Sequence, residues 1–354
     1  MNDQPYLLYT GRATPTVEST PLLPQEGVRH IRVHTAEHPM TLLIGAAVVS
    51  HNGALYTSWA QAPDAIPENG PEEHTRGRRS TDDGASWSEP VVMAPAHDHG
   101  RNHSHGSFLS HGGELWFFAP TYVPDTKSYF GDLRTEAFVL DESNGSWRSR
   151  GIVAEDLYPM DEPKRLPDGR WIMGGLNGAA RAAVAVSRDD SPASWRTVAL
   201  PQAPGGAFGE TTVVVGADRL LAIVRPNHHT ESCALVHESF DRGVSWTTER
   251  VSNYPMAPSK PNAGILPDGR MYLISNLGPD RSVPTIAVGP AGCLEVDRVF
   301  RLRPDSPSPP RHSGRDHKPQ WAYFYSHVCG GSLYIAYHHA KEDAELTVVP
   351  VASF

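Results

Sequence analysis

Apolar and polar residues alternate along this chain in short runs, and tight turns separate the runs. Six of the turns share one layout, in which two turn residues precede a run rich in apolar side chains. They are Asn52-Gly53, Gly112-Gly113, Asp168-Gly169, Ala217-Asp218, Asp268-Gly269 and Gly330-Gly331. Asn-Gly and Asp-Gly between strand-like runs are strong signals of a β-hairpin. The pattern therefore predicts an all-β chain with six similar hairpins and no long amphipathic helix.

A second motif recurs between the hairpins. Ser80–Trp87 and Ser239–Trp246 both read Ser-x-Asp-x-Gly-x-Ser-Trp, and weaker relatives end at Trp147 and Trp195. The four tryptophans are roughly 50 to 60 residues apart, which is the length of a four-stranded propeller blade. One β-propeller domain spanning residues 1–354 is therefore expected.

The six hairpins predict six blades, and the last blade needs a strand from elsewhere in the chain. The apolar segment Pro5–Tyr9 is the expected closing strand. Residues 11–40 and 296–318 are rich in proline and charge, and they leave room for a seventh blade.

The repeated motif describes a turn in physical terms. Its Asp can accept hydrogen bonds from turn amides, its Gly permits a positive φ, and its Trp anchors the turn by burying a ring. The motif resembles the Asp-box of the sialidase (neuraminidase) superfamily of β-propellers. That resemblance implies a fold but no activity, because an Asp-box is structural.

Composition narrows the classes of partner. The formal charge of −9 argues against nucleic acid and anionic membranes. The N-terminus lacks a signal-peptide pattern and no apolar run is long enough to span a membrane, so a cytoplasmic protein is expected. The three cysteines show no metal-binding spacing, and no cofactor is expected. A monomer or small homo-oligomer acting on a small carbohydrate fits these features.

The repeated turns allow equivalent blade positions to be aligned. Inner strands and the loops after second strands converge on one mouth of a propeller's channel. At one fixed offset before the turns, or beside it, stand five residues that we call the mouth ring: His105, Asp161, Glu210, Lys260 and Tyr323. Positions after the turns and the loops beyond them add Arg225, Asn276, His338, Arg281, Asn227, His228 and Lys341. Ionisable groups converging on a cleft favour a site.

The segment Arg101–Gly106 is the densest group of polar residues. His103 and His105 are two apart, so in a regular strand they share a face. Histidine suits proton transfer near neutral pH. The pair could also hold a metal, but no spacing marks a third ligand, so no metal site is predicted.

Several of these residues invite comparison with sialidases. In that family a Glu supports a Tyr nucleophile, and three arginines hold the sialic acid carboxylate. Glu210, Arg225, Arg281 and Tyr325 resemble the Glu, two of the arginines and the Tyr. The first arginine is absent, because the first inner strand reads Leu43-Ile-Gly45. This departure argues against ordinary sialic acid hydrolysis.

The chain also resembles sialidase-like propellers that act on rhamnose–glucuronate linkages and related uronic-acid polysaccharides. Segments Asp161–Pro163, Pro258–Gly264 and Leu333–Asp343 carry this resemblance. Such proteins include lyases and glycosidases, so the resemblance implies a carbohydrate-active enzyme without choosing its reaction.

A uronate lyase needs a group that neutralises the carboxylate, a base and an acid. Arg225, helped by Lys260 or Asn262, can supply the first, His105 or His103 the second, and Tyr325 or Tyr323 the third. Further candidate substrate-binding residues are Asp161, Tyr323, Arg281, Asn276, His338 and Arg101. A hydrolase using Tyr325 with Glu210, or Asp161 with Glu210, is the alternative. A non-catalytic sugar-binding propeller is the second alternative.

Overall fold

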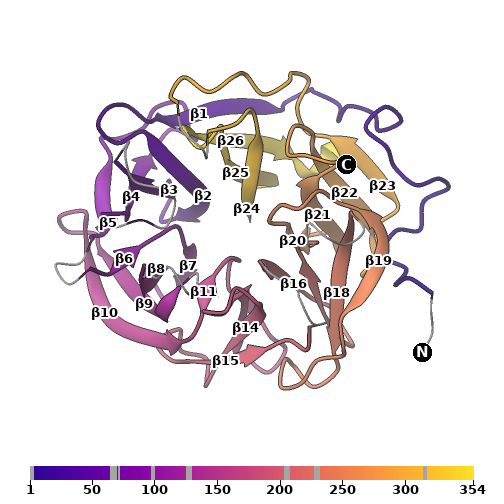
Figure 1. Cartoon of the computed structure of the whole chain (residues 1–354), viewed down its shortest axis with the longest axis horizontal. Helices are drawn as coiled ribbons and strands as arrows, with labels where there is room; N and C mark the ends of the chain where they lie inside the picture. Colours follow the sequence, from indigo (N-terminus) through magenta and orange to yellow (C-terminus); the bar gives the residue numbers. More distant parts are fainter. Residues whose placement is uncertain are drawn as a thin grey trace.

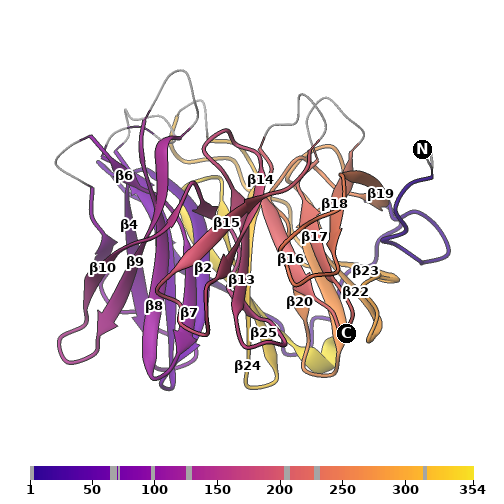
Figure 2. The same ribbon diagram turned by 90° about the horizontal axis from the view of Figure 1, so that it is seen from below.

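The computed structural model describes residues 4–63, 70, 72–96, 100–124, 130–202, 208–226, 232–313 and 317–354. The described strands form six sheets arranged as a ring around a central axis (Figure 1). Seen from the side, the strands run between the two faces of the ring (Figure 2). The prediction of an all-β, six-bladed propeller is confirmed.

Each blade is an antiparallel sheet with four strand positions, and in blades two and three the inner position is divided into two short strands. The chain moves outward from the axis through each blade, except that the outer strand of blade six is β1 (Arg29–Thr35). Blade one contains β2 (Leu42–His51), β3 (Ala54–Ala62), β4 (His74–Ser80) and β5 (Val91–Ala94). Blade two contains β6 (Asn102–His103), β7 (Ser107–His111), β8 (Glu114–Val123), β9 (Gly131–Asp141) and β10 (Ser146–Glu155). Blade three contains β11 (Tyr158–Pro159), β12 (Lys164–Arg165), β13 (Trp171–Leu176), β14 (Ala182–Ser187) and β15 (Trp195–Ala199).

The other three blades follow the same plan. Blade four contains β16 (Thr211–Val215), β17 (Leu220–Val224), β18 (Cys233–Ser239) and β19 (Arg250–Pro255). Blade five contains β20 (Asn262–Ile265), β21 (Arg270–Asn276), β22 (Pro284–Ala291) and β23 (Arg298–Arg301). Blade six contains β24 (Trp321–Cys329), β25 (Ser332–His339), β26 (Asp343–Pro350) and β1 (Arg29–Thr35), and the 3₁₀ turn η1 (Val351–Ser353) follows. All six predicted hairpin turns connect the first and second strands of their blades.

An N-terminal strand closes the ring, but it is not the one that the apolar pattern indicates. The closing strand is β1, which pairs antiparallel with β26. The segment Pro5–Tyr9 instead packs against blades four and five, where Tyr6 bridges Ser252 and Tyr9 bridges Val296. β1 was missed because it is an edge strand of mostly polar residues, and only Val33 in it is buried.

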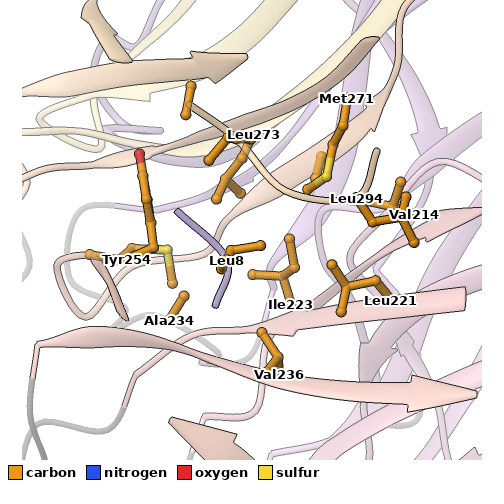
Figure 3. Close-up of a cluster of buried hydrophobic side chains, with 14 of the residues drawn as sticks. Leu8, Val214, Leu221, Ile223, Ala234, Val236, Tyr254, Met271, Leu273 and Leu294 are labelled. Atoms are coloured by element: carbon orange, nitrogen blue, oxygen red, sulfur yellow. The ribbon is translucent and has the colours of Figure 1, made fainter. Parts of the chain in front are cut away.

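The core consists of apolar clusters between neighbouring blades. In one of them, Leu8 from the N-terminal segment is fully buried among side chains of blades four and five, including Ile223 and Leu273 (Figure 3). Leu8 therefore fills a gap between two blades. Residues 296–313 contain β23 and a segment in which Arg303 and Arg311 pair with Glu345 and Asp343 of blade six. No seventh sheet occurs among the described residues.

Both clear Asp-box copies form the expected turns. The Ser80 hydroxyl accepts a hydrogen bond from the Gly84 amide at 2.9 Å, and Asp82 accepts one from the Ser86 amide at 2.8 Å. Ser239 and Asp241 make the equivalent bonds in blade four. These turns join third and fourth strands, so they lie at the end of each blade opposite the loops that follow second strands. Within the described parts of the chain, no helix has the length and apolar character to cross a bilayer.

Candidate active site in the central mouth

Inner strands become irregular at the residues that the turn alignment selected. In blade two the inner strand is interrupted between β6 and β7, where His105 stands, and in blade three between β11 and β12, where Asp161 stands. In blade six the register of β24 shifts between Ala322 and Tyr325, and Tyr323 has a φ of 62°. Such bulges redirect side chains and are common beside functional sites.

His105 and Tyr325 form a buried pair at the centre. Nδ1 of His105 lies 2.9 Å from the Tyr325 hydroxyl, and both side chains are 2% exposed. Burial, helped by the charges of Lys260 and Lys341, holds the pKa of His105 well below its usual range. Burial also raises the pKa of Tyr325 well above its usual range. At neutral pH the pair therefore consists of an uncharged imidazole and a protonated phenol.

A second tyrosine pairs with the mouth glutamate. The Tyr323 hydroxyl donates a hydrogen bond to Glu210 at 2.5 Å, and the other oxygen of Glu210 lies 3.0 Å from the Arg225 guanidinium. Tyr323, rather than Tyr325, is thus the tyrosine supported by Glu210. Arg225 is 5% exposed and is committed to this ion pair, so it is not well placed to neutralise a substrate carboxylate.

The carboxylate of Asp161 is bonded to groups of the framework. It is fully buried and accepts hydrogen bonds from Lys164 at 2.5 Å, the Val213 amide at 2.8 Å and Asn262 at 3.2 Å. The Asn262 oxygen in turn accepts a hydrogen bond from Ser326. Asp161 and Asn262 therefore join blades three, four, five and six beneath the mouth, and neither side chain is arranged to contact a substrate.

Lys260 lies beside the His105–Tyr325 pair. Its Nζ is 3.7 Å from the centre of the Tyr325 ring and donates to the Phe324 carbonyl oxygen. The side chain is fully buried, and this burial lowers its pKa to about 7, against the opposing influence of Asp161 and Glu210. Near neutral pH this lysine therefore changes between a charged and a neutral form.

This low pKa predicts a pH dependence of stability. Between pH 7 and 10.5 the unfolded chain binds more protons at Lys260 than the folded one, so stability rises with pH across that window. We expect the free energy of unfolding of the wild type to rise relative to Lys260→Met by about 1.4 kcal/mol per pH unit within the window. Urea unfolding at several pH values measures this, and Lys318→Met, at an exposed lysine, is the control. Parallel curves for wild type and Lys260→Met would contradict the expectation.

Two more candidates lie beside Tyr323, and a third belongs to the framework. The His338 ring stacks on the Tyr323 ring at 5.4 Å, and the Arg281 guanidinium lies 5.5 Å from that ring. Asn276 is fully buried and donates to the Trp321 carbonyl oxygen at 2.9 Å, so it ties blade five to blade six. His338 and Arg281 are brought to the mouth ring, whereas the amide of Asn276 is used in the framework.

His103 and Arg101 do not join the mouth ring. His103 Nδ1 lies 2.6 Å from the carbonyl oxygen of Pro95, which follows β5, and its Nε2 lies 3.0 Å from Glu136 in β9, so both ring nitrogens are engaged away from the mouth ring. Arg101 forms an ion pair with Asp132 at 2.7 Å. The same-face expectation for His103 and His105 was wrong because the strand breaks between them. Asn227 and His228 lie outside the described residues.

The alignment missed two residues near the pair. Tyr158 is buried with its ring 5.1 Å from the His105 ring, and Glu73 is fully buried and accepts a hydrogen bond from the Ser104 hydroxyl. Tyr158 stands before the interruption in blade three, so counting back from the turn passes over it. Glu73 precedes a third strand, a position that the turns do not align. The Tyr158-Pro159 pair just before Asp161 was the feature of the sequence that could have pointed to Tyr158.

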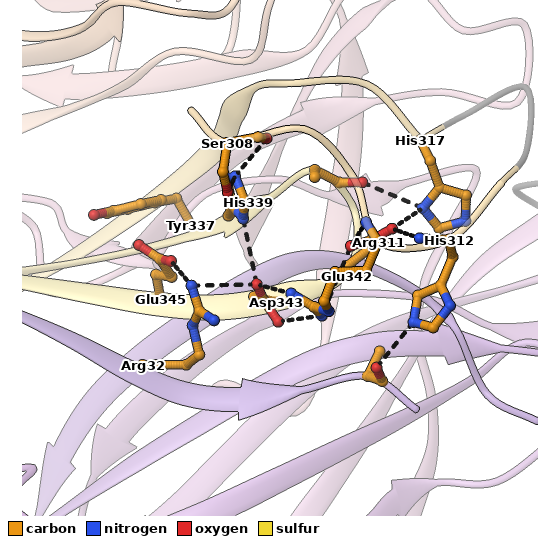
Figure 4. Close-up of polar contacts among 12 residues, drawn as sticks. Arg32, Ser308, Arg311, His312, His317, Tyr337, His339, Glu342, Asp343 and Glu345 are labelled. Carbon is orange, nitrogen blue, oxygen red and sulfur yellow. Dashed lines mark hydrogen bonds and ion pairs between the residues drawn. The ribbon is translucent and has the colours of Figure 1, made fainter. Parts of the chain in front are cut away.

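One group of side chains has the spacing of a metal site. Among the described residues, His339, Asp343 and Glu345 place three ligand atoms within 4.8 Å of one another. Arginines already neutralise them: Arg311 lies 2.7 Å from Asp343, and Arg303 lies 2.8 Å from Glu345. The group therefore acts as an ion-pair network, in which Figure 4 shows the Arg32 and Arg311 pairs.

Comparison with known proteins places this ring in a wider group. A family model described as "BNR repeat-like domain" matches residues 55–335. No curated protein sequence matches the chain. The similar solved structures include a protein of unknown function from Dyadobacter fermentans, with a TM-score of 0.71 and 14% identity over 92% of this chain and 99% of that one.

Two sialidase-type structures are also similar. The intramolecular trans-sialidase from Ruminococcus gnavus has a TM-score of 0.69 and 11% identity over 91% of this chain and 98% of that one. The Trypanosoma rangeli sialidase has a TM-score of 0.66 and 12% identity over 95% of this chain and 60% of that one. At these identities the likeness shows a shared fold.

Proposed function

This chain belongs to the BNR repeat-like domain family, and we propose that its mouth ring cleaves a glycosidic bond of a uronic-acid-containing carbohydrate by β-elimination. The hydrogen bond between His105 and Tyr325 carries this proposal. It joins a neutral base and a protonated acid in one buried pair, with cationic side chains nearby. The sialidase-like fold of the similar structures supports a carbohydrate as substrate.

The elimination needs one proton removed and one delivered. In the proposed step, His105 takes the proton from C5 of the uronate, and the electrons of that bond form a C4–C5 double bond. The bond from C4 to the leaving oxygen breaks, and the Tyr325 hydroxyl protonates that oxygen. A neutral imidazole can accept a proton, and the raised pKa of Tyr325 keeps its proton available. No water is consumed.

The step also requires a positive charge near the carboxylate, because this makes the C5 proton more acidic. Arg225 is paired with Glu210, and Asn262 is bonded to Asp161. Lys260, against the Tyr325 ring, and Arg281, over the Tyr323 ring, are better situated for this role. We therefore propose that these two cations add to the positive charge around the carboxylate.

Hydrolysis is a second candidate, favoured by the Tyr323–Glu210–Arg225 chain. A carboxylate that accepts the phenol hydrogen bond at 2.5 Å can activate that tyrosine as a nucleophile. The expected hydrolase pairs differ from this arrangement, since Tyr325 bonds to His105 and Asp161 is held by Lys164, the Val213 amide and Asn262.

The two reactions differ in their products. Elimination from rhamnose–glucuronate oligosaccharides is expected to give an unsaturated uronate that absorbs ultraviolet light, with no label taken up from heavy-oxygen water. Among matched variants, Tyr325→Phe should lower kcat/KM by about 10²–10⁴-fold, the usual contribution of a general acid or base. Tyr323→Phe should have a much smaller effect. Cleavage without absorbance and with label in the product, abolished by Tyr323→Phe, would instead establish the hydrolase.

A further inference from the structure

The hairpin turn between β25 and β26 brings a lysine from blade six to the inner end of blade one. Ala340 and Lys341 both have positive φ, at 51° and 58°, which is an unusual conformation for residues other than glycine. The Lys341 carbonyl oxygen accepts a hydrogen bond from the Leu43 amide at 2.7 Å, and Lys341 is 7% exposed. The lysine is therefore fastened beside the start of β2.

Neighbouring segments hold this turn on three sides. The Ala340 amide donates to the Gln320 carbonyl oxygen at 2.9 Å, and the Glu342 carbonyl oxygen accepts from the Ala36 amide at 2.7 Å. The Glu342 carboxylate accepts from the amides of Arg311 and His312 at 2.8 and 2.7 Å (Figure 4). Such bonding can maintain two left-handed residues in sequence. The segment Arg311–His312 thus supports the Lys341 turn, and the side chain of the same Arg311 pairs with Asp343.

The inner strand of blade one, β2, has a glycine and therefore no side chain at this place. Gly45 has a φ of 69°, and a Cβ there would lie 2.0 Å from Cγ of His105. The imidazole of His105 occupies the space that any residue other than glycine would need. A cation beside Gly45 therefore cannot come from this position of β2.

His338 contributes a hydrogen-bond donor to the same place. Its Nδ1 accepts from the Gly45 amide at 3.3 Å, so in the neutral ring Nε2 carries the proton. That Nε2 is buried and finds no hydrogen-bond partner among the residues that the structure describes. A buried donor normally has an acceptor, and a substrate oxygen would supply one.

The electrostatics agree with this geometry. After burial, the charges of Lys260 and Lys341 lower the pKa of His105, and those of Lys341 and Arg281 lower the pKa of His338. The Lys341 ammonium therefore acts on both of the imidazoles that lie beside Gly45.

We propose that Lys341 binds the substrate carboxylate above Gly45, with Nε2–H of His338 donating to one of the carboxylate oxygens. The inference rests on the proposed function for the class of substrate, an acidic sugar. The subsite that selects acidic sugars would lie at the boundary between blades six and one, where blade six supplies the cation. Lys341 is thus a specificity residue that contacts the acid group.

Equilibrium binding tests this subsite without requiring cleavage. Calorimetric titrations would use D-glucuronate and N-acetylneuraminate as acidic probes and D-glucose as the neutral probe. Lys341→Met is expected to bind the acids about tenfold or more weakly than the wild type, as for a lost charged hydrogen bond. Lys341→Arg should retain most of the affinity, and Lys318→Met, at an exposed lysine, should match the wild type. Urea unfolding checks the fold, and Lys341→Gln replaces Lys341→Met if that variant does not fold.

Equal affinity of wild type and Lys341→Met for both acids would overturn the inference, as would a wild type that binds neither acid. Failure of the proposed function looks different. Binding of acids that depends on Lys341, without an unsaturated product, would refute elimination and keep the subsite. An unsaturated product formed with a KM that Lys341→Met leaves unchanged would refute the subsite and keep elimination.

Discussion

Replacing His105 by alanine is expected to lower kcat/KM for uronate cleavage by about 10²–10⁴-fold, because the variant lacks the base that removes the C5 proton. The loss should appear mainly in kcat, since the cations that hold the acid group remain. Steady-state kinetics on the wild type and variant would measure it. Urea unfolding is needed alongside, because removing a buried ring leaves a cavity and lowers stability.

The chain provides a matched control two residues earlier. His103 is also fully buried, but its ring nitrogens contact the Pro95 carbonyl oxygen and Glu136 rather than the mouth ring. His103→Ala should lower the free energy of unfolding and leave the kcat/KM of the folded enzyme close to that of the wild type. Full activity in His105→Ala, or an equal loss in folded His103→Ala, would refute the assignment of the base.

The second large effect concerns stability. Asp343 is fully buried and lies 2.9 and 2.7 Å from the two terminal nitrogens of Arg311. Its carboxylate also lies 3.4 Å from Arg32 on the closing strand. Asp343→Ala is expected to lower the free energy of unfolding by about 3 kcal/mol, as for other buried pairs that lose one partner. Asp305→Ala, which removes a half-exposed partner of Arg303, should cost less than about 1 kcal/mol.

The pH dependence of this effect has a definite sign. Hydrogen bonds and the charges of Arg311 and Arg32 hold the pKa of Asp343 well below its usual range, although burial opposes them. A depressed folded-state pKa contributes stability above the unfolded-state value, and this contribution disappears as the pH falls through the folded-state value. The difference in unfolding free energy between wild type and Asp343→Ala should therefore be full at pH 7 and shrink in acid. A difference that stays constant into strong acid would contradict this origin.

The number and order of the blades could be predicted from the sequence because local turn motifs recur from blade to blade. The six hairpin turns and the Asp-boxes require particular backbone conformations, and these do not depend on the rest of the fold. The closing strand was different. β1 is polar, and its strand character comes from pairing with β26, which no local pattern reveals. Pro5–Tyr9 is apolar for another reason, because Leu8 fills the gap between two blades.

The sequence indicated which residues lie together in the candidate site, but not which of them are hydrogen-bonded to one another. Counting from the turns brought His105, Glu210 and Tyr323 together because inner strands share one register. It could not say which tyrosine meets Glu210, since Tyr323 and Tyr325 share a face in a regular strand and a bulge separates their partners. The break between β6 and β7 likewise moved His103 away from His105. Local irregularities of the backbone, which decide such pairings, leave little trace in residue patterns.

The way the ring closes also has a consequence for biosynthesis. His30 in β1 and Thr347 in β26 are hydrogen-bonded side chains separated by 317 residues. The ribosome makes β1 before any of the blades and β26 after all the others. Blade six therefore cannot pair its outer strand until β26 has been made, and until then the polar edge of β1 has no partner from its own blade. Ring closure is a late, long-range event, and contacts of this kind slow folding.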